Sequence, residues 1–206
     1  EDTRVTSKLT EKYGFTAKLY DCHKFNEKER SERIISILNE GKNIALVSDA
    51  GTPLISDPGS VLLRELSKNN INVTSLPGAC AVTTFLSQIP RDNEEYAFIG
   101  FIPRTQNQQK EILEKYKFTN CVFYESPNRL LETLNNILAF FGENQKVAIG
   151  RELTKIYEEV KIGTVKEIID YYSENTLKGE IVAMVFAKES ESLSDDFLKE
   201  KINSLR

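Results

Sequence analysis

The residues best suited to hold a ligand are concentrated at positions 48–59, which read SDAGTPLISDPG. This segment follows a short apolar run at residues 44–47 that is typical of a β-strand. Proline lacks a backbone N–H and glycine adopts conformations that other residues avoid, so the segment is expected to be a loop. A loop at the carboxyl end of a strand can bring backbone groups to a ligand, and Asp49 and Asp57 add negative charge there. The alternative is a tight turn whose aspartates bond to backbone groups.

A second segment of small residues, PGACA at positions 77–81, follows an apolar run and opens a short helix. Small side chains let a ligand approach a helix N-terminus, whose free N–H groups suit partial negative charge or lone pairs. Close packing of the helix on a sheet would call for the same residues. Further polar loops follow other predicted strands, so we expect a ligand site between the two halves of the chain. These loops span residues 124–129, 151–155 and 179–180.

Composition and motif spacing argue against several classes of protein. A catalytic triad would have to use His23, the single histidine, and the GxSxG, Walker and GxGxxG motifs are absent from the sequence. Cys22, Cys80 and Cys121 lack CxxC spacing, so we predict no disulfide framework and no metal site, and reduced thiols in the cytoplasm. The net charge of −4 argues against nucleic-acid binding through overall charge, although a local basic face would still allow it. No apolar run is long enough to span a membrane.

The predicted elements describe an α/β protein of two domains. Residues 1–90 alternate helices with short strands, a pattern typical of a mostly parallel sheet. Residues 91–188 contain more strands per helix, which favours a mixed sheet, and the polar segment 88–95 is the predicted boundary. The predicted strands span residues 16–22, 44–47, 73–76, 96–101, 121–124, 147–150, 158–164 and 181–187.

Caps and glycines mark several helix ends. A helix over residues 1–13 is predicted to stop at Gly14, and another is predicted to begin at Asn26, with Glu29 completing a capping box. Thr164 is predicted to cap a third helix.

The two ends of the chain give two further predictions. The sequence opens on Glu1 rather than methionine, in text typical of a protein interior, so we expect the first strand of the fold to precede it. Residues 189–206 are expected to form an acidic tail, with a helix from Ser194, that leads to a further C-terminal segment.

Seven segments of the chain, taken in order, resemble the ribosomal small-subunit RNA methyltransferase I family, which is a branch of the tetrapyrrole-methylase-like, class III S-adenosylmethionine enzymes. They are EDTRVTSKL, LVSDAGTPLISDPG, LPGACAVTTF, FIGFIPR, FYESPNRLLETL, RELTKIYEEV and KGEIV. The resemblance implies two α/β domains with a cofactor cleft between them. It also implies methyl transfer from S-adenosylmethionine to the ribose 2′-hydroxyl of a cytidine in 16S rRNA, within the small ribosomal subunit, by a cytoplasmic homodimer.

The chain departs from the family pattern at two of these segments. Asn128 stands where the family usually has histidine, and Ala79 stands where proline is frequent. The family's first strand and glycine-rich loop would lie before Glu1.

The resemblance also implies which residues bind the cofactor. The methyl donor is a sulfonium cation, so carbonyl and carboxylate oxygens should surround it rather than lysine or arginine, which agrees with the composition of residues 48–59. The implied cofactor positions are Asp49, Gly51, Thr52, Pro53, Leu54, Ile55, Ala79, Cys80, Ala81, Phe123, Tyr124, Glu180, Ile181 and Val182.

Methyl transfer is an in-line displacement, so most of the acceleration should come from holding the hydroxyl oxygen about 3 Å from the methyl carbon. A general base would add about 10²- to 10⁴-fold. The candidate bases are Asp2, Asp49 and Glu125, each of which could instead cap a helix or form an ion pair.

Cations in loops and at helix starts are candidates for binding RNA phosphates, because positioning RNA requires positive charge even on an acidic protein. They are Arg4, Arg104, Arg129, Arg151 and Lys155, and solvated surface charge is the alternative for each.

Two other functions stay open at this point. A related methylase could act on a tetrapyrrole or another small molecule, because this fold uses one cofactor cleft for many substrates. A non-catalytic protein could bind S-adenosylmethionine or RNA without turnover. The YESP and RELTK segments favour the RNA methyltransferase.

Overall fold

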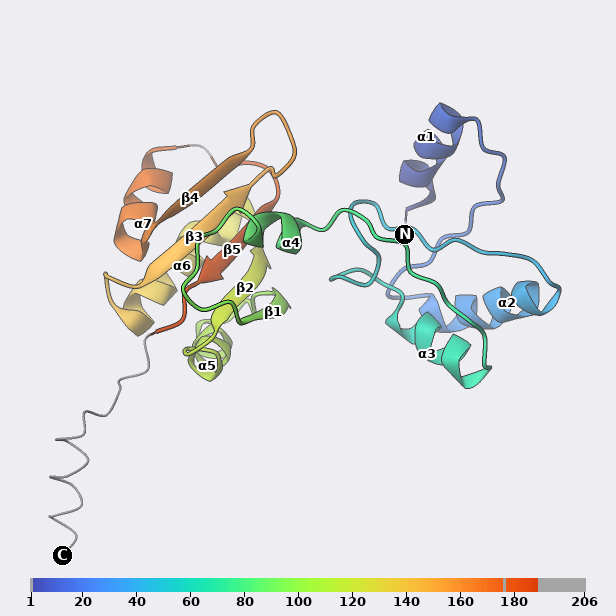
Figure 1. The fold of residues 1–206 in the computed structure, drawn as a ribbon, viewed down its shortest axis with the longest axis horizontal. Helices are drawn as coiled ribbons and strands as arrows, with labels where there is room; N and C mark the ends of the chain where they lie inside the picture. The colour runs from blue at the N-terminus through green and yellow to red at the C-terminus, as the bar shows by residue number, and fades with distance from the viewer. Residues whose placement is uncertain (1, 176, 189–206) are drawn as a thin grey trace, which may run out of the picture. The chain divides into compact units, whose positions relative to one another are not determined.

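A computed structural model of the chain describes residues 2–175 and 177–188 (Figure 1). The chain divides into two compact units, Glu1–Thr84 and Phe85–Arg206. The predicted domain limits at residues 90 and 188 stay a prediction. The tail at 189–206, with its expected helix from Ser194, lies outside the described residues.

The first unit contains helices α1 (Thr3–Tyr13), α2 (Glu27–Asn39) and α3 (Ser60–Lys68), and most of the short helix α4 (Ala81–Leu86). The predicted stop of α1 is confirmed, because Gly14 takes up the left-handed conformation, with φ of 68°, that favours glycine at a helix end.

Helices α2 and α3 pack together around Ile34, Leu62 and Leu66. The predicted capping box of α2 is wrong, because the Asn26 side chain makes no bond to the helix N-terminus. Its amide oxygen instead accepts a hydrogen bond from the backbone N–H of His23.

The side chain of Glu27 joins α2 to the start of α3. This carboxylate is buried, and it accepts hydrogen bonds from the backbone N–H groups of Gly59 and Val61, the latter at 3.1 Å. The first N–H groups of a helix have no partner within the helix, and their partial positive charge favours a carboxylate. Glu27 therefore serves as the N-terminal cap of a helix that begins more than thirty residues later in the chain.

Removing this carboxylate should destabilise the first unit. We expect Glu27→Ala to lower its free energy of unfolding by about 1–3 kcal/mol, because buried N–H groups lose their acceptor. Glu29→Ala is the matched control: Glu29 lies on the same helix but is exposed, so its change should stay within about 0.5 kcal/mol. Urea denaturation followed by helical circular dichroism compares the two variants, and equal stabilities would contradict the capping role.

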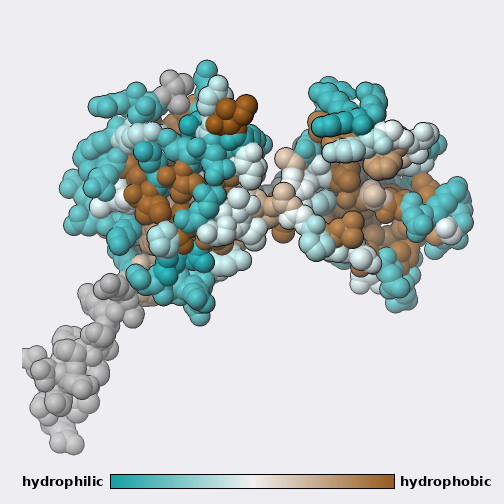
Figure 2. Space-filling view, turned by 45° about the horizontal axis from the view of Figure 1, so that its top comes forward, coloured by the Kyte–Doolittle hydropathy of each residue, from teal (hydrophilic) through white to brown (hydrophobic). Residues whose placement is uncertain are grey.

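The strands predicted at residues 16–22, 44–47 and 73–76 are wrong, because the described part of the first unit contains no β-strand. Strand propensity marks where a chain is extended, but a strand forms only when a neighbour supplies the hydrogen-bond ladder. In this structure, apolar side chains of these segments stay exposed, Val73 by 54% and Leu76 by 81%. Figure 2 shows hydrophobic residues on the surface of this unit.

The second unit is built on a five-stranded sheet in the order β1-β2-β5-β3-β4. The strands are β1 (Tyr96–Phe101), β2 (Asn120–Glu125), β3 (Lys146–Arg151), β4 (Glu159–Thr164) and β5 (Ile181–Val185). β1 and β2 are parallel, and the other neighbouring pairs are antiparallel. The predicted mixed sheet is therefore confirmed.

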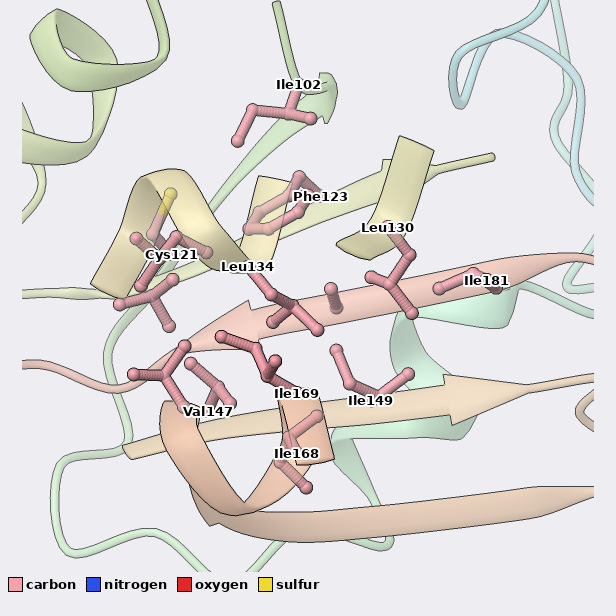
Figure 3. Close-up of a cluster of buried hydrophobic side chains, with 14 of the residues drawn as sticks. Ile102, Cys121, Phe123, Leu130, Leu134, Val147, Ile149, Ile168, Ile169 and Ile181 are labelled. Carbon is pink, nitrogen blue, oxygen red and sulfur yellow. The ribbon is translucent and has the colours of Figure 1, made fainter. Parts of the chain in front are cut away.

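One face of this sheet carries the main hydrophobic core, in which strand residues pack against helices α5 (Gln106–Lys115), α6 (Pro127–Phe141) and α7 (Val165–Glu174). Thr164 caps α7, as predicted, and the structure adds a capping box with Glu167. Figure 3 shows the core side chains of β2, β3 and β5 pointing toward those of α6 and α7. They include Cys121, Phe123, Val147, Ile149, Ile181, Leu130, Leu134, Ile168 and Ile169.

The opposite face of the sheet is also buried at its centre, where Val122, Ala148 and Met184 are 0% exposed. Phe85, at the end of α4, is 0% exposed and lies against Gly150 of β3. A Cβ atom built on Gly150 would lie 2.6 Å from Phe85 Cδ2, so glycine is required for this close approach.

Candidate functional site

The loop at residues 48–59 has an unusual backbone. Gly51 has φ of 76°, and two residues with side chains, Leu54 and Ser56, have φ of 68° and 73°. Left-handed conformations at such residues cost energy and tend to persist at ligand-binding sites. The hydroxyl of Ser48 donates to the Gly51 carbonyl at 3.0 Å, which holds the start of the loop.

The structure brings this loop to the second candidate segment. The Thr52 hydroxyl donates a hydrogen bond to the Ala79 carbonyl at 2.9 Å. A Cβ atom on Gly51 would lie 3.5 Å from the same carbonyl oxygen. Some cofactor candidates of this unit are exposed, namely Asp49, Gly51, Ile55, Ala79 and Ala81. The others are partly exposed, namely Thr52, Pro53, Leu54 and Cys80. Two loops that lie 27 residues apart in sequence thus form one accessible surface.

Asp49 lies at the start of this surface and is linked to the start of α1. Its Oδ1 accepts a hydrogen bond from the backbone N–H of Asp2 at 2.9 Å. The Asp2 carboxylate itself caps α1 and binds Arg4, with the shortest oxygen–nitrogen distance 2.6 Å. The hydrogen bond from Arg4 lowers the pKa of Asp2 to about 2. Both Asp2 carboxylate oxygens already accept hydrogen bonds from Arg4, so Asp49 is the better placed of these two candidate bases.

Glu125 is buried and bonded to neighbouring groups of the protein. Its side chain is 0% exposed, and its two oxygens accept hydrogen bonds from the Ser126 N–H at 2.6 Å and the Thr133 hydroxyl at 2.7 Å. Arg129 lies 3.1 Å from Oε2 and compensates its charge. A buried, fully bonded carboxylate cannot reach a substrate proton, so we leave Glu125 out of the proposed catalytic set.

The cofactor candidates of the second unit lie on neighbouring strands. Tyr124 of β2 is paired with Val182 of β5. Phe123 and Ile181 point into the core, so only their backbone could meet a ligand (Figure 3). Glu180 precedes β5, and its side chain is 74% exposed and binds Lys155 at 3.1 Å.

Most of the candidate RNA-binding cations are already bonded within the protein. Arg4 binds Asp2, Arg129 donates to the Pro103 carbonyl at 2.9 Å, Arg151 lies 3.5 Å from Glu159, and Lys155 binds Glu152 at 2.8 Å. Arg104 is exposed and, within the described part of the chain, makes no hydrogen bond or ion pair. Of the five cations, Arg104 is therefore the most available to a phosphate.

The loop after β3, predicted at residues 151–155, is held by bonds that the sequence did not reveal. Glu152 and Thr154 have φ of 50° and 65°. Glu152 accepts hydrogen bonds from Lys155 at 2.8 Å and from the Glu180 N–H at 2.9 Å. The bond from Lys155 is the largest cause of the lowered pKa of Glu152. Gly179 has φ of 93°, which favours glycine, and a Cβ atom there would displace the Glu152 carboxylate.

Residues 2–175 and 177–188 contain no group of three histidine, cysteine, aspartate or glutamate side chains that could hold a metal ion. The helices within these ranges are too short or too polar to cross a lipid bilayer.

Comparison with known proteins identifies relatives over almost the whole chain. A family model described as Tetrapyrrole (Corrin/Porphyrin) Methylases matches residues 2–169. The chain is 44% identical to "Ribosomal RNA small subunit methyltransferase I" of Halalkalibacterium halodurans, over 90% of this chain and 64% of the relative. It is 40% identical to the protein of the same name from Escherichia coli O157:H7, over 90% of this chain and 66% of the relative. It is 36% identical to the Haemophilus influenzae protein of that name, over 100% of this chain and 74% of the relative. The chain thus spans about two thirds of the length of these relatives.

Solved structures show the same fold at low sequence identity. A diphthine synthase structure has a TM-score of 0.68 at 14% identity, covering 94% of this chain and 78% of that chain. A Thermus thermophilus uroporphyrin-III C-methyl transferase, complexed with S-adenyl homocysteine, has a TM-score of 0.53 at 11% identity. The match covers 78% of this chain and 73% of that chain. The resemblance seen in the sequence is confirmed: the chain has the tetrapyrrole methylase fold and belongs to the ribosomal RNA small subunit methyltransferase I branch of the tetrapyrrole methylase family.

Proposed function

We propose that this protein is a methyltransferase that uses S-adenosylmethionine to methylate the ribose 2′-hydroxyl of a cytidine in 16S rRNA. One observation carries the proposal: the Thr52–Ala79 hydrogen bond joins two accessible, glycine-containing loops in a chain whose relatives are named rRNA small subunit methyltransferases. The proposal includes a homodimer in the bacterial cytoplasm and an acceptor within the small ribosomal subunit.

The residues of the first unit fit a sulfonium ligand. Residues 48–59 and 77–81 contain no lysine or arginine, and they offer carbonyl oxygens and the exposed Asp49 carboxylate. When bound, the cofactor would supply an electrophilic methyl group on a positively charged sulfur. Oxygen atoms stabilise such a charge, whereas a nearby cation would oppose binding.

The protein's own part in the reaction is positioning and proton acceptance. Residues 51–55 and 79–81 would hold the donor, and the RNA would be held so that its hydroxyl oxygen lies in line with the breaking bond. Asp49 would accept the hydroxyl proton, and its bond to the Asp2 N–H fixes the orientation of its carboxylate. Arg104 would bind a phosphate of the acceptor.

Cys80 provides a direct test of the cofactor surface. Cys22 and Cys121 are buried and Cys80 is partly exposed. Burial raises the pKa of Cys121 to about 12, and burial is also the largest cause of the raised pKa of Cys22. Because the thiolate is the reactive form, we expect iodoacetamide to alkylate Cys80 first. S-adenosylhomocysteine should slow that reaction, as measured by mass spectrometry of peptides.

Adenosine at the same concentration as S-adenosylhomocysteine is the control ligand for this experiment. Equal alkylation of Cys80 with and without S-adenosylhomocysteine would contradict the assignment of residues 79–81 to the cofactor. Transfer of labelled methyl groups to small ribosomal subunits tests the acceptor separately.

A further inference from the structure

A bulge in β1 brings two phenylalanines to the same face of the sheet. Phe98 pairs with Val122, but the register then shifts, and Phe101 pairs with Tyr124. Gly100, between them, has φ of 72°. In a regular strand, residues three apart point to opposite faces. The bulge therefore redirects Phe101, a change that sheets often use next to functional sites.

The result is a cluster of three rings at the carboxyl end of the parallel pair β1–β2. The Tyr124 ring lies 5.5 Å from Phe101 and 5.0 Å from Phe98, centroid to centroid, with interplanar angles of 60° and 70°. Phe101 is nevertheless 61% exposed. Its ring is thus supported from the protein side and open to solvent on the other.

Phe101 and Tyr124 belong to a row of paired residues that crosses the sheet on the face opposite the main core. Gly150 pairs with Val182, Val182 with Tyr124, and Tyr124 with Phe101. The row is covered by Phe85 at Gly150 and opens to solvent at Phe101. Tyr124 and Val182 are also cofactor positions that the family resemblance implies, so Phe101 adjoins the candidate cofactor residues of the second unit.

The charge around Phe101 suits a nucleic acid. Residues 96–104, from the start of β1 to the exposed Arg104, contain no aspartate or glutamate, in a chain whose net charge is −4. Glu125, at the end of β2, is buried and compensated by Arg129. An anionic polymer could therefore approach this ring, with the exposed Arg104 three residues away for a phosphate.

We infer that Phe101, supported by Tyr124 and Phe98, is a stacking platform for an unpaired base of the RNA acceptor, and so a positioning residue for methyl transfer. The inference rests on the proposed function. Proteins that recognise single-stranded RNA commonly stack unpaired bases on aromatic rings, which accept any base.

The test compares four variants of the full-length protein in steady-state methyl transfer to small ribosomal subunits that lack the modification. Phe101→Ala and Phe101→Leu should raise KM for the subunit by about 5- to 100-fold, the effect of one stacked base. Phe101→Tyr, which keeps the ring, should stay close to wild type. Phe118→Ala is the matched control, since Phe118 is 55% exposed and its ring lies beside Lys117 outside this cluster.

Ultraviolet crosslinking gives a readout independent of activity: a nucleotide adduct is expected on the tryptic peptide of residues 92–104 and should be lost in Phe101→Ala. Three results would overturn the inference. They are an unchanged KM in Phe101→Ala, a loss of S-adenosylhomocysteine affinity in that variant, or a Leu variant that works as well as Tyr. If the wild-type protein methylates no RNA, the proposed function itself fails before the variants are compared.

Discussion

Phe85→Ala is expected to lower the free energy of unfolding of the second unit by about 3–5 kcal/mol, the usual cost of removing a buried phenylalanine ring. Phe85 is 0% exposed and lies against Gly150, so its loss leaves a cavity against the sheet. Gly150 has no side chain to fill that cavity. Hydrogen exchange of the β3 and β5 amides measures the effect within this unit.

Phe118→Ala serves as the control for this experiment too, because the same group is removed from a site that is 55% exposed. Its effect should stay within about 0.5 kcal/mol, as for most surface substitutions. If both variants lost the same protection, Phe85 would not be part of the core of this unit.

Asp49→Asn is expected to lower kcat for methyl transfer by about 10²- to 10⁴-fold, the contribution of a general base. Asparagine has nearly the same shape and can still accept the hydrogen bond that Asp49 receives from the Asp2 N–H. The substitution therefore removes the proton acceptor and leaves the loop in place. Single-turnover assays with saturating RNA and S-adenosylmethionine measure the rate.

Calorimetry with S-adenosylhomocysteine separates this effect from a loss of binding, because the product carries no charge on sulfur and should bind the variant as it binds the wild type. Asp170→Asn is the control, since Asp170 is a surface residue of α7 that binds Lys166. A rate in Asp49→Asn equal to that of the control would mean that another group, or water, takes the proton.

The strands of the second unit, and the mixed character of their sheet, could be predicted from the sequence. These strands are short, apolar runs between turn residues, and the helices of this unit carry local end signals such as the capping box of Thr164 and Glu167. Local signals suffice here because each predicted strand finds a neighbour in the sheet. The bulge at Gly100 is the exception: alternation predicts opposite faces for Phe98 and Phe101, and only pairing with β2 reveals the change.

The first unit shows the limit of local signals. Residues 44–47 and 73–76 have the composition of strands, yet they form no β-strand, because no neighbouring strand among the described residues pairs with them. The capping role of Glu27 likewise cannot be predicted from the residues next to it in sequence, because the N–H groups that it binds lie at the start of another helix. Such long-range pairing depends on tertiary structure, and propensity does not encode it.

Candidate site residues could be predicted by type but not by environment. The sequence identified both loops of the proposed cofactor surface, and their contact through Thr52 appeared only in the structure. It offered Glu125 and Arg129 as a base and a phosphate ligand, whereas the structure pairs them with each other. Residue type gives the chemistry that a side chain can perform, but burial and partners decide whether it is available.

The central claim is most directly tested by methyl transfer with the full-length protein. Small ribosomal subunits that lack the modification would be incubated with labelled S-adenosylmethionine, and the RNA would then be digested to nucleosides. The account predicts label in 2′-O-methylcytidine. Label in a base, or no label in RNA while S-adenosylhomocysteine still protects Cys80, would contradict it and favour a small-molecule methylase or a non-catalytic binding protein.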